Sequence, residues 1–270
     1  MLFRSLPVPE VADSQTGDKV PKRVESLTVF NGFLYGSSYD GGHVYRYDGQ
    51  NWVDCGQVGD NTQTYSFAPF RGQLHVATWR SGRVFRFGEI GRWTDTGRLG
   101  EELEVMGMLV HNGRFIAGTL PLAQVYSYEG DGQWKLLERL DHTPDVTYRR
   151  AWTMAEHDGQ VFCSTLPSGK IYSFSAGRQT QWGKTLNSDW HQIGATKSKN
   201  HLTLFVDGQQ VSQSAKFDAT GYQLDSKAPL QLGTGVNGPF QGQLEDVRIY
   251  RRVLSANEIQ SLARSRPSTR

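Results

Sequence analysis

The first two thirds of the chain repeat one pattern of apolar strands and glycine turns. An apolar segment, a turn with glycine and a second apolar segment recur around four glycines: Gly32, Gly72, Gly113 and Gly159. A strand with alternating aromatic residues, such as Val44–Tyr47, begins twelve residues after each glycine. A tryptophan closes each repeat, at Trp52, Trp93, Trp134 and, less regularly, Trp182. Period-two alternation between turns of Gly, Asp, Asn and Pro predicts short antiparallel strands.

The turn glycines are 40, 41 and 46 residues apart. Four short strands in about 40 residues are typical of one β-propeller blade. We therefore predict four propeller-type blades over residues 24–180, after an N-terminal extension over residues 1–23. The turn glycine, the Val-Tyr-x-Tyr strand and the closing tryptophan resemble kelch-like propeller repeats. A sialidase-type Asp box is the rival reading, but Asp48–Trp52 lacks the residue between its Asp and its Gly.

The last third follows a different pattern, from residue 181 to residue 265. Alternating apolar residues flank Asp207-Gly208, a strong hairpin signal. Further strands are predicted at Leu230–Gly233 and Phe240–Tyr250. Ser255 and Glu258 have capping-box spacing and predict a short helix, the only one expected. The side chains expected inside this region are Trp190, Ile193, Leu204, Val206, Val247 and Ile249.

The order of these motifs resembles the C-terminal half of a laminin-G-like (concanavalin A-like lectin/glucanase) domain. The motifs are W-H-x-x-A, L-x-L-x-V-D-G, F-x-G-x-L-x-D-V-R-I-Y and L-S-x-x-E-I, read here with Trp190, Leu202, Phe240 and Leu254 as their first residues. The resemblance implies an extracellular protein that binds glycans or mediates adhesion, and it leaves calcium open as a cofactor. The predicted fold class is all-β: four blades, a partial laminin-G-like sandwich, a short C-terminal helix and a basic tail over residues 266–270.

Composition and charge narrow the classes of partner. The formal net charge of +2 is too small for a nucleic-acid-binding surface, and no apolar stretch is long enough for membrane insertion. No signal peptide is visible at Met1–Pro7. We expect an extracellular or cell-surface location, a carbohydrate or glycoprotein partner, and a place among further domains of a larger protein.

Motifs for catalysis, cofactors or metals are not found. The run Gly233–Gly238 matches G-x-G-x-x-G, but a strand rather than a helix is predicted after it, so dinucleotide binding is not expected. No G-x-S-x-G, H-E-x-x-H or C-x-x-C occurs. Asp207 is explained by its turn and Asp246 by its strand. We assign no catalytic residue, no metal ligand and no cofactor.

The topology of a four-stranded meander brings two kinds of loop to one end of the blades. These are the loops between the second and third strands and the connections between blades. Aromatic rings with Arg and Asp side chains suit a sugar, and loops on a rigid scaffold commonly carry binding sites. The candidate ligand-binding residues on these loops are Tyr39, Asp40, Trp79, Arg80, Tyr148, Arg149 and Arg150. Alternatively, Trp152 belongs to the core and the arginines are solvated charges at the rim.

The sequence thus favours a non-catalytic, extracellular-type binding protein with carbohydrate as ligand. A glycoside hydrolase or sialidase-like enzyme using the same loops is one alternative, since carboxylates such as Asp40 and Asp145 lie on them. A protein-interaction scaffold without a small-molecule site is the other.

Overall fold

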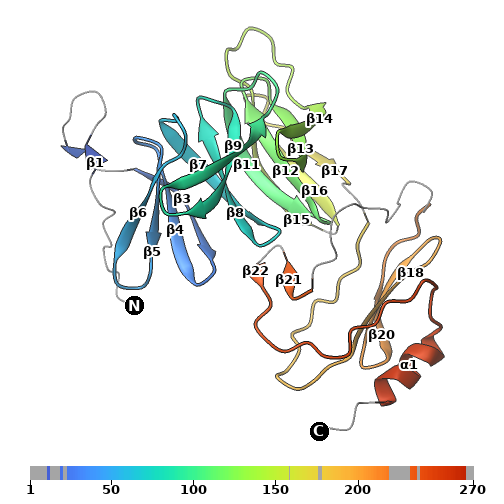
Figure 1. The fold of residues 1–270 in the computed structure, drawn as a ribbon. Coiled ribbons are helices and arrows are strands. Elements are labelled where there is room, and N and C mark those ends of the chain that lie inside the picture. The colour runs from blue at the N-terminus through green and yellow to red at the C-terminus, as the bar shows by residue number, and fades with distance from the viewer. Residues whose placement is uncertain are drawn as a thin grey trace, which may run out of the picture. The chain divides into compact units, whose positions relative to one another are not determined.

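The structure is a computed structural model that describes residues 11–12, 19–20, 23–157, 159–175, 178–218, 232–235 and 238–265. The basic tail over 266–270, most of the expected extension over 1–23, and Leu230 with Gln231 lie outside the described residues. The fold is all-β with one short helix in the described part, and it divides into two compact regions (Figure 1). One comprises residues 1–174 with 232–241, and the other residues 175–231 with 242–270.

Three blades of four antiparallel strands follow one another along the first region. Blade 1 contains β3 (Val24–Phe30), β4 (Phe33–Ser38), β5 (His43–Tyr47) and β6 (Trp52–Gln57). Blade 2 contains β7 (Gln63–Phe70), β8 (Gln73–Trp79), β9 (Arg83–Glu89) and β10 (Arg92–Arg98). Blade 3 contains β11 (Glu104–His111), β12 (Arg114–Leu120), β13 (Gln124–Gly130) and β14 (Gln133–Arg139). A bridge between Glu104 and Trp79 joins blades 2 and 3 into one sheet.

Blade 4 has three strands, β15 (Arg150–His157), β16 (Gln160–Leu166) and β17 (Ile171–Phe174). The four-strand pattern predicted for every repeat is therefore wrong for the last one, because Trp182 lies outside any strand. Residues 178–190 are mostly polar, so this segment has no alternating apolar face to bury against β17.

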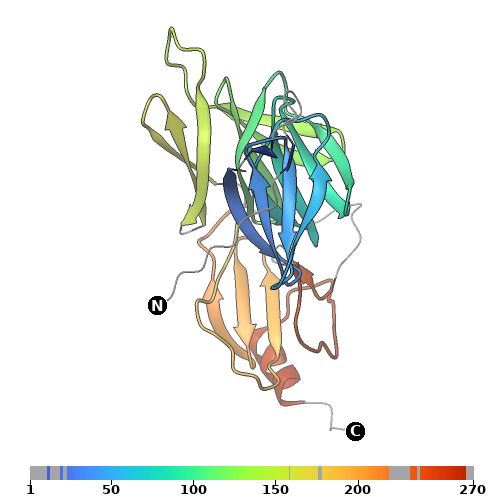
Figure 2. The same cartoon turned by 90° about the vertical axis from the view of Figure 1, so that its left-hand side faces the viewer.

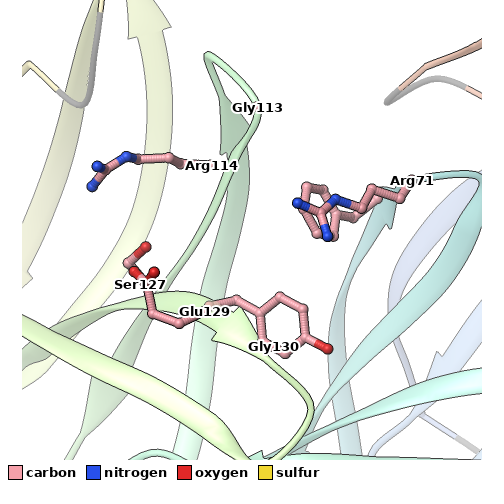
Figure 3. Close-up of a pocket in the computed structure, with 8 residues that line it drawn as sticks. Arg71, Gly113, Arg114, Ser127, Glu129 and Gly130 are labelled. Atoms are coloured by element: carbon pink, nitrogen blue, oxygen red, sulfur yellow. The ribbon is translucent and has the colours of Figure 1, made fainter. Parts of the chain in front are cut away.

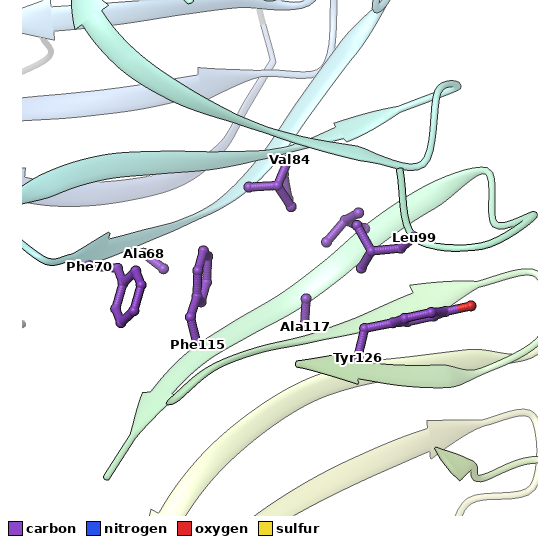
Figure 4. Packing of buried hydrophobic residues seen from close by; sticks show 9 residues of the cluster. Ala68, Phe70, Val84, Leu99, Phe115, Ala117 and Tyr126 are labelled. Carbon is purple, nitrogen blue, oxygen red and sulfur yellow. The ribbon is translucent and has the colours of Figure 1, made fainter. Parts of the chain in front are cut away.

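The blades pack through aromatic and aliphatic side chains. The core between blades 2 and 3 contains Phe70, Val84, Leu99 and Phe115 among others (Figure 4). Indole N–H groups also join neighbouring blades: Trp93 donates to the carbonyl of Cys55 over 3.0 Å, and Trp134 to the carbonyl of Thr96 over 3.2 Å. The expected packing role of the repeated aromatics is confirmed at three positions that are almost fully buried: Tyr45, Phe85 and Tyr126.

The second region holds the sheet β18 (Ile193–Lys197), β19 (Leu202–Val206) and β20 (Gln209–Gln213) and the helix α1 (Ala256–Arg264), orange to red in Figure 2. The turn at Asp207-Gly208 has positive φ at both residues, as the hairpin prediction requires. The predicted capping box is confirmed: Ser255 accepts from the Glu258 amide, and Glu258 accepts from the Ser255 amide. Ile259 of the helix is buried, as are Phe205 and Val206.

The predicted strand Phe240–Tyr250 is wrong, since residues 240–250 belong to no strand and Asp246 has a positive φ of 54°. Val247 and Ile249 are 53% and 72% exposed, and Trp190 and Ile193 are also exposed, so these four do not form the predicted interior. The alternation is present in the sequence, but a strand needs a hydrogen-bonded neighbour and an opposing apolar layer. Short pairs complete the described strands: β1 (Val11–Ala12) with β2 (Lys19–Val20), and β21 (Thr234–Gly235) with β22 (Gly238–Pro239).

Candidate functional site

Each blade places the start of its first strand beside the loop between its second and third strands. In blade 1 the register pairs Val24 with Ser38, and His43 with Gln57, so the loop 39–42 and the connection after Gln57 lie at one end of the sheet. The same register recurs in blades 2, 3 and 4. We call the first strand of each blade its inner strand. The candidate loops and the starts of the four inner strands therefore lie at the same end of their blades.

A β-bulge interrupts each inner strand at the same place. Register shifts fall between Val24 and Leu27, Thr64 and Phe67, Val105 and Met108, and Ala151 and Met154. Bulges re-aim side chains and are common beside functional sites. The residues nine positions before the turn glycines stand just before these bulges: Arg23, Gln63, Glu104 and Arg150. The residues seven positions before the turn glycines stand inside them: Glu25, Tyr65, Met106 and Trp152. We call all of these residues except Met106, together with Tyr39 and Tyr148, the inner-strand cluster.

Tyr39 lies at the blade 1 side of the cluster. Its ring meets the ring of Tyr65 edge to face, with centroids 6.3 Å apart. The guanidinium of Arg23 lies 4.1 Å from the centre of the Tyr39 ring. Asp40 accepts from the side chain of Arg23 over 2.8 Å and from its backbone N–H over 2.9 Å. Asp40 therefore holds Arg23 against Tyr39 and acts as a positioning group.

Glu104 is the buried acid of the cluster. It is 5% exposed, and this burial raises the pKa of its carboxyl to about 7, against the opposing effects of a hydrogen bond from Tyr65 and the positive charge of Arg150. The negative charge of Glu25 adds to the increase. Near neutral pH the carboxyl therefore exists in both protonation states and can donate or accept a proton.

Arg150 and two aromatic rings form the blade 4 side. The guanidinium of Arg150 lies 5.8 Å from the ring centre of Tyr148 and 5.6 Å from that of Trp152. The exposed fractions of Tyr148 and Trp152 are 41% and 40%. These rings offer apolar area to a ligand beside a cation, an arrangement that suits the faces and hydroxyls of a sugar.

Two of the predicted residues, Arg149 and Trp79, also make contacts within the fold. Arg149 donates from its backbone N–H to the carbonyl of Pro121 over 2.8 Å and from Nε to the carbonyl of Thr143 over 2.6 Å. Trp79 is half-buried at the end of β8, and its carbonyl accepts from the Thr62 amide over 3.1 Å. Arg149 thus ties the connection before blade 4 to the third blade.

Arg80 lies at a separate hollow formed by blade 2 and the connection that precedes it. This cavity has a volume of about 460 Å³, within the range of small-molecule sites. Charged side chains line it: Asp60, Arg80, Arg83 and Asp95. Arg83 and Asp95 already form an ion pair of 2.5 Å. The seven predicted residues therefore fall into three groups. Tyr39, Tyr148 and Arg150 belong to the inner-strand cluster, and Arg80 lies at the second hollow. The others make contacts within the fold: Asp40, Trp79 and Arg149.

The opposite end of the blades carries a smaller hollow of about 180 Å³ (Figure 3). Arg71, Arg114 and Glu129 line it together with the ring of Tyr128. Its volume is below that of typical ligand sites. The sequence analysis placed no candidate there.

Glu104, Tyr65 and Arg23 were missed by sequence reasoning. The signal that could have found them is the repeat phase, because each stands at a fixed distance before its turn glycine. Among the described residues, no group of three or more His, Cys, Asp or Glu side chains could hold a metal ion. The helix that the structure describes is too short and polar to cross a membrane.

Residues 143–260 match the family described as the concanavalin A-like lectin/glucanases superfamily. The match includes blade 4 and most of the second region, and it contains Tyr148, Arg150 and Trp152. It begins well before residue 181, where the resemblance was first placed. No curated protein matches the chain.

Several solved structures are similar at low identity. The extracellular domain of the putative one-component system BT4673 from B. thetaiotaomicron has 14% identity and a TM-score of 0.45, over 76% of this chain and 28% of that one. The computationally designed Ika4 protein has 14% identity and a TM-score of 0.42, over 63% and 100%. The selenomethionine-substituted virginiamycin B lyase from Staphylococcus aureus has 9% identity and a TM-score of 0.41, over 76% and 72%.

Proposed function

We propose that the protein binds carbohydrate, free or on a glycoprotein, at the inner-strand cluster and without turning it over. The observation that carries the proposal is the position of Arg150 over the two partly exposed rings of Tyr148 and Trp152. Stacking on such rings supplies apolar contact, while Arg150 and Glu104 supply a donor and an acceptor for hydroxyl groups.

The family match supports the same ligand class. The matched family is described by lectins and glucanases, and the match covers all three residues of the blade 4 side of the cluster. We also propose an extracellular or cell-surface location and a relationship of the blades to kelch-like propellers. Family membership alone does not define a ligand, so the argument rests on the side chains.

A glycoside hydrolase is the second candidate, and Glu104 is the observation that favours it. A carboxyl with a pKa near 7 is typical of the general acid in such enzymes. A second carboxylate must lie across the bond to be cleaved. Glu25 is the carboxylate whose charge Glu104 experiences, and it is exposed.

The test is binding of the full chain to a panel of polysaccharides, measured by calorimetry alongside product release. Trp152→Ala and Tyr148→Ala should each weaken binding about tenfold, the equivalent of about 1.4 kcal/mol, because each removes a stacking surface. Their melting temperatures should stay near that of the parent protein, since both rings are partly exposed. Ile90→Ala, an exposed position in the turn between β9 and β10, is the matched control.

Three outcomes separate the readings. Binding that both substitutions weaken, with no product, supports the proposal. Product release that Glu104→Gln abolishes supports the hydrolase instead. Absence of binding to every glycan, or binding that neither aromatic substitution changes, contradicts a sugar site at this cluster.

A further inference from the structure

One interface is repeated three times along the blades. The first strand of each blade packs against the first three strands of the blade before it: β7 against blade 1, β11 against blade 2 and β15 against blade 3. The residue twelve positions after the turn glycine lies on the face covered in this way. Val44, Val84 and Val125 occupy that position and are 0%, 0% and 1% exposed.

The described residues of the first region leave the same face of blade 4 uncovered. Ile171 occupies the position of Val44, Val84 and Val125, yet it is 72% exposed. The uncovered face is therefore apolar at the position that the other blades bury completely. Burial of a large aliphatic side chain stabilises a protein, so leaving Ile171 in water forgoes a contact that the repeat provides three times.

A hydroxyl six positions before the turn glycine marks the same interface in blades 1, 2 and 4, whereas Gly107 stands at that position in blade 3. Ser26 donates to the carbonyl of Tyr65 over 2.7 Å, and Ser66 donates to the carbonyl of Met106. Thr153 occupies their position in blade 4 and is exposed. Its hydroxyl lies 2.9 Å from that of Ser164, as the hydroxyl of Ser26 lies 3.0 Å from that of Ser37. Blade 4 thus keeps the local geometry that serves the contact in blade 1.

Blade 1 presents the complementary face. Leu27 and Val29 of β3 are 61% and 69% exposed. The corresponding residues in the next two blades pack into the cores with the preceding blade: Phe67 in blade 2, and Met108 and Val110 in blade 3.

The two uncovered faces are the two halves of one repeated interface. We propose that a second copy of this chain covers them, with blade 4 of one copy packed head to tail on blade 1 of its partner. Ile171 then packs against the partner's Leu27 and the partner's Val29. The hydroxyl of Thr153 donates to the carbonyl of the partner's Glu25, which stands where Tyr65 and Met106 stand in blades 2 and 3. Such an interface is heterologous, and it closes a ring if both ends of each copy engage.

The experiment is light scattering coupled to size-exclusion chromatography on the full chain and two variants. Ile171→Asp and Leu27→Asp each place a charge on one of the two faces, so each should convert dimers or longer assemblies to monomers. Both side chains are exposed in the single chain, so the melting temperature of the monomer should not fall. Ile90→Asp, which adds the same charge away from either face, should leave the assembly unchanged.

Mixing the two variants tests the direction of the contact. Ile171→Asp keeps a normal blade 1 face and Leu27→Asp keeps a normal blade 4 face. The mixture should therefore recover one interface and form a heterodimer that neither variant forms alone. A monomeric parent protein at its highest soluble concentration would overturn the proposal. So would an assembly that both variants retain, or a mixture that stays monomeric.

Discussion

The hydroxyl of Tyr65 acts on the carboxyl of Glu104 across the boundary between blades 2 and 3 and lowers its pKa against the larger effect of burial. The same hydroxyl donates to the side chain of Gln63 over 2.5 Å. Tyr65 is seven positions before its turn glycine and Glu104 is nine positions before its own, so the contact joins the two rows of the inner-strand cluster. Glu104 is the first residue of β11, and Tyr65 lies in the bulge of β7. Its buried acid makes the cluster sensitive to pH.

Glu104 should make the stability of the protein depend on pH. Its folded-state pKa of about 7 lies above the ordinary value of 4.5 for a glutamate carboxyl, so the folded state binds the proton more tightly. The stabilisation is fully present below about pH 4.5 and is lost as the pH rises through 7. Glu104→Gln removes this titration. The free energy of unfolding of the variant relative to the parent should therefore rise between pH 5 and 7.5, by up to about 3 kcal/mol.

Urea unfolding at a series of pH values measures that difference. A difference that stays flat across this pH range would show that the Glu104 carboxyl ionises normally.

Gly82 and Gly169 occupy the same repeat position in blades 2 and 4, with φ of +62° and +66°. A Cβ at Gly82 would lie 2.0 Å from the carbonyl oxygen of Glu102, whereas a Cβ at Gly169 would meet nothing within 4 Å. Gly82→Ala should therefore cost more than about 3 kcal/mol, from strain and a backbone clash, and Gly169→Ala about 1 kcal/mol, from the positive φ alone. Thermal unfolding of the two variants measures the contrast, and equal losses would contradict the close approach at Gly82.

Val206 and Val247 provide a matched pair in the second region. Val206 is buried in β19, whereas Val247 is exposed in the unpaired segment. Val206→Ala should lower the free energy of unfolding by about 1–3 kcal/mol, and Val247→Ala by less than about 0.5 kcal/mol. A large loss at Val247 would mean that the segment is paired as the sequence pattern predicts.

The alternation around Phe240–Tyr250 shows where sequence reasoning fails. Its apolar residues have the period of a strand, but pairing and burial depend on a neighbouring strand that residues 243–250 do not have in the structure. Ile171 shows the same limit. Its residue type and repeat position match Val84, and the difference in burial depends on whether another blade lies against it.

Local signals determined the elements that could be predicted. Positive φ at the turn glycines, period-two alternation and the capping box of Ser255 and Glu258 each act within a few residues, so the sequence alone placed the first three blades and the helix. The assembly of Glu104, Tyr65 and Arg150 was decided only by tertiary structure. These residues are far apart in the chain, and the raised pKa of Glu104 arises from burial beside neighbours that stacking of the blades supplies.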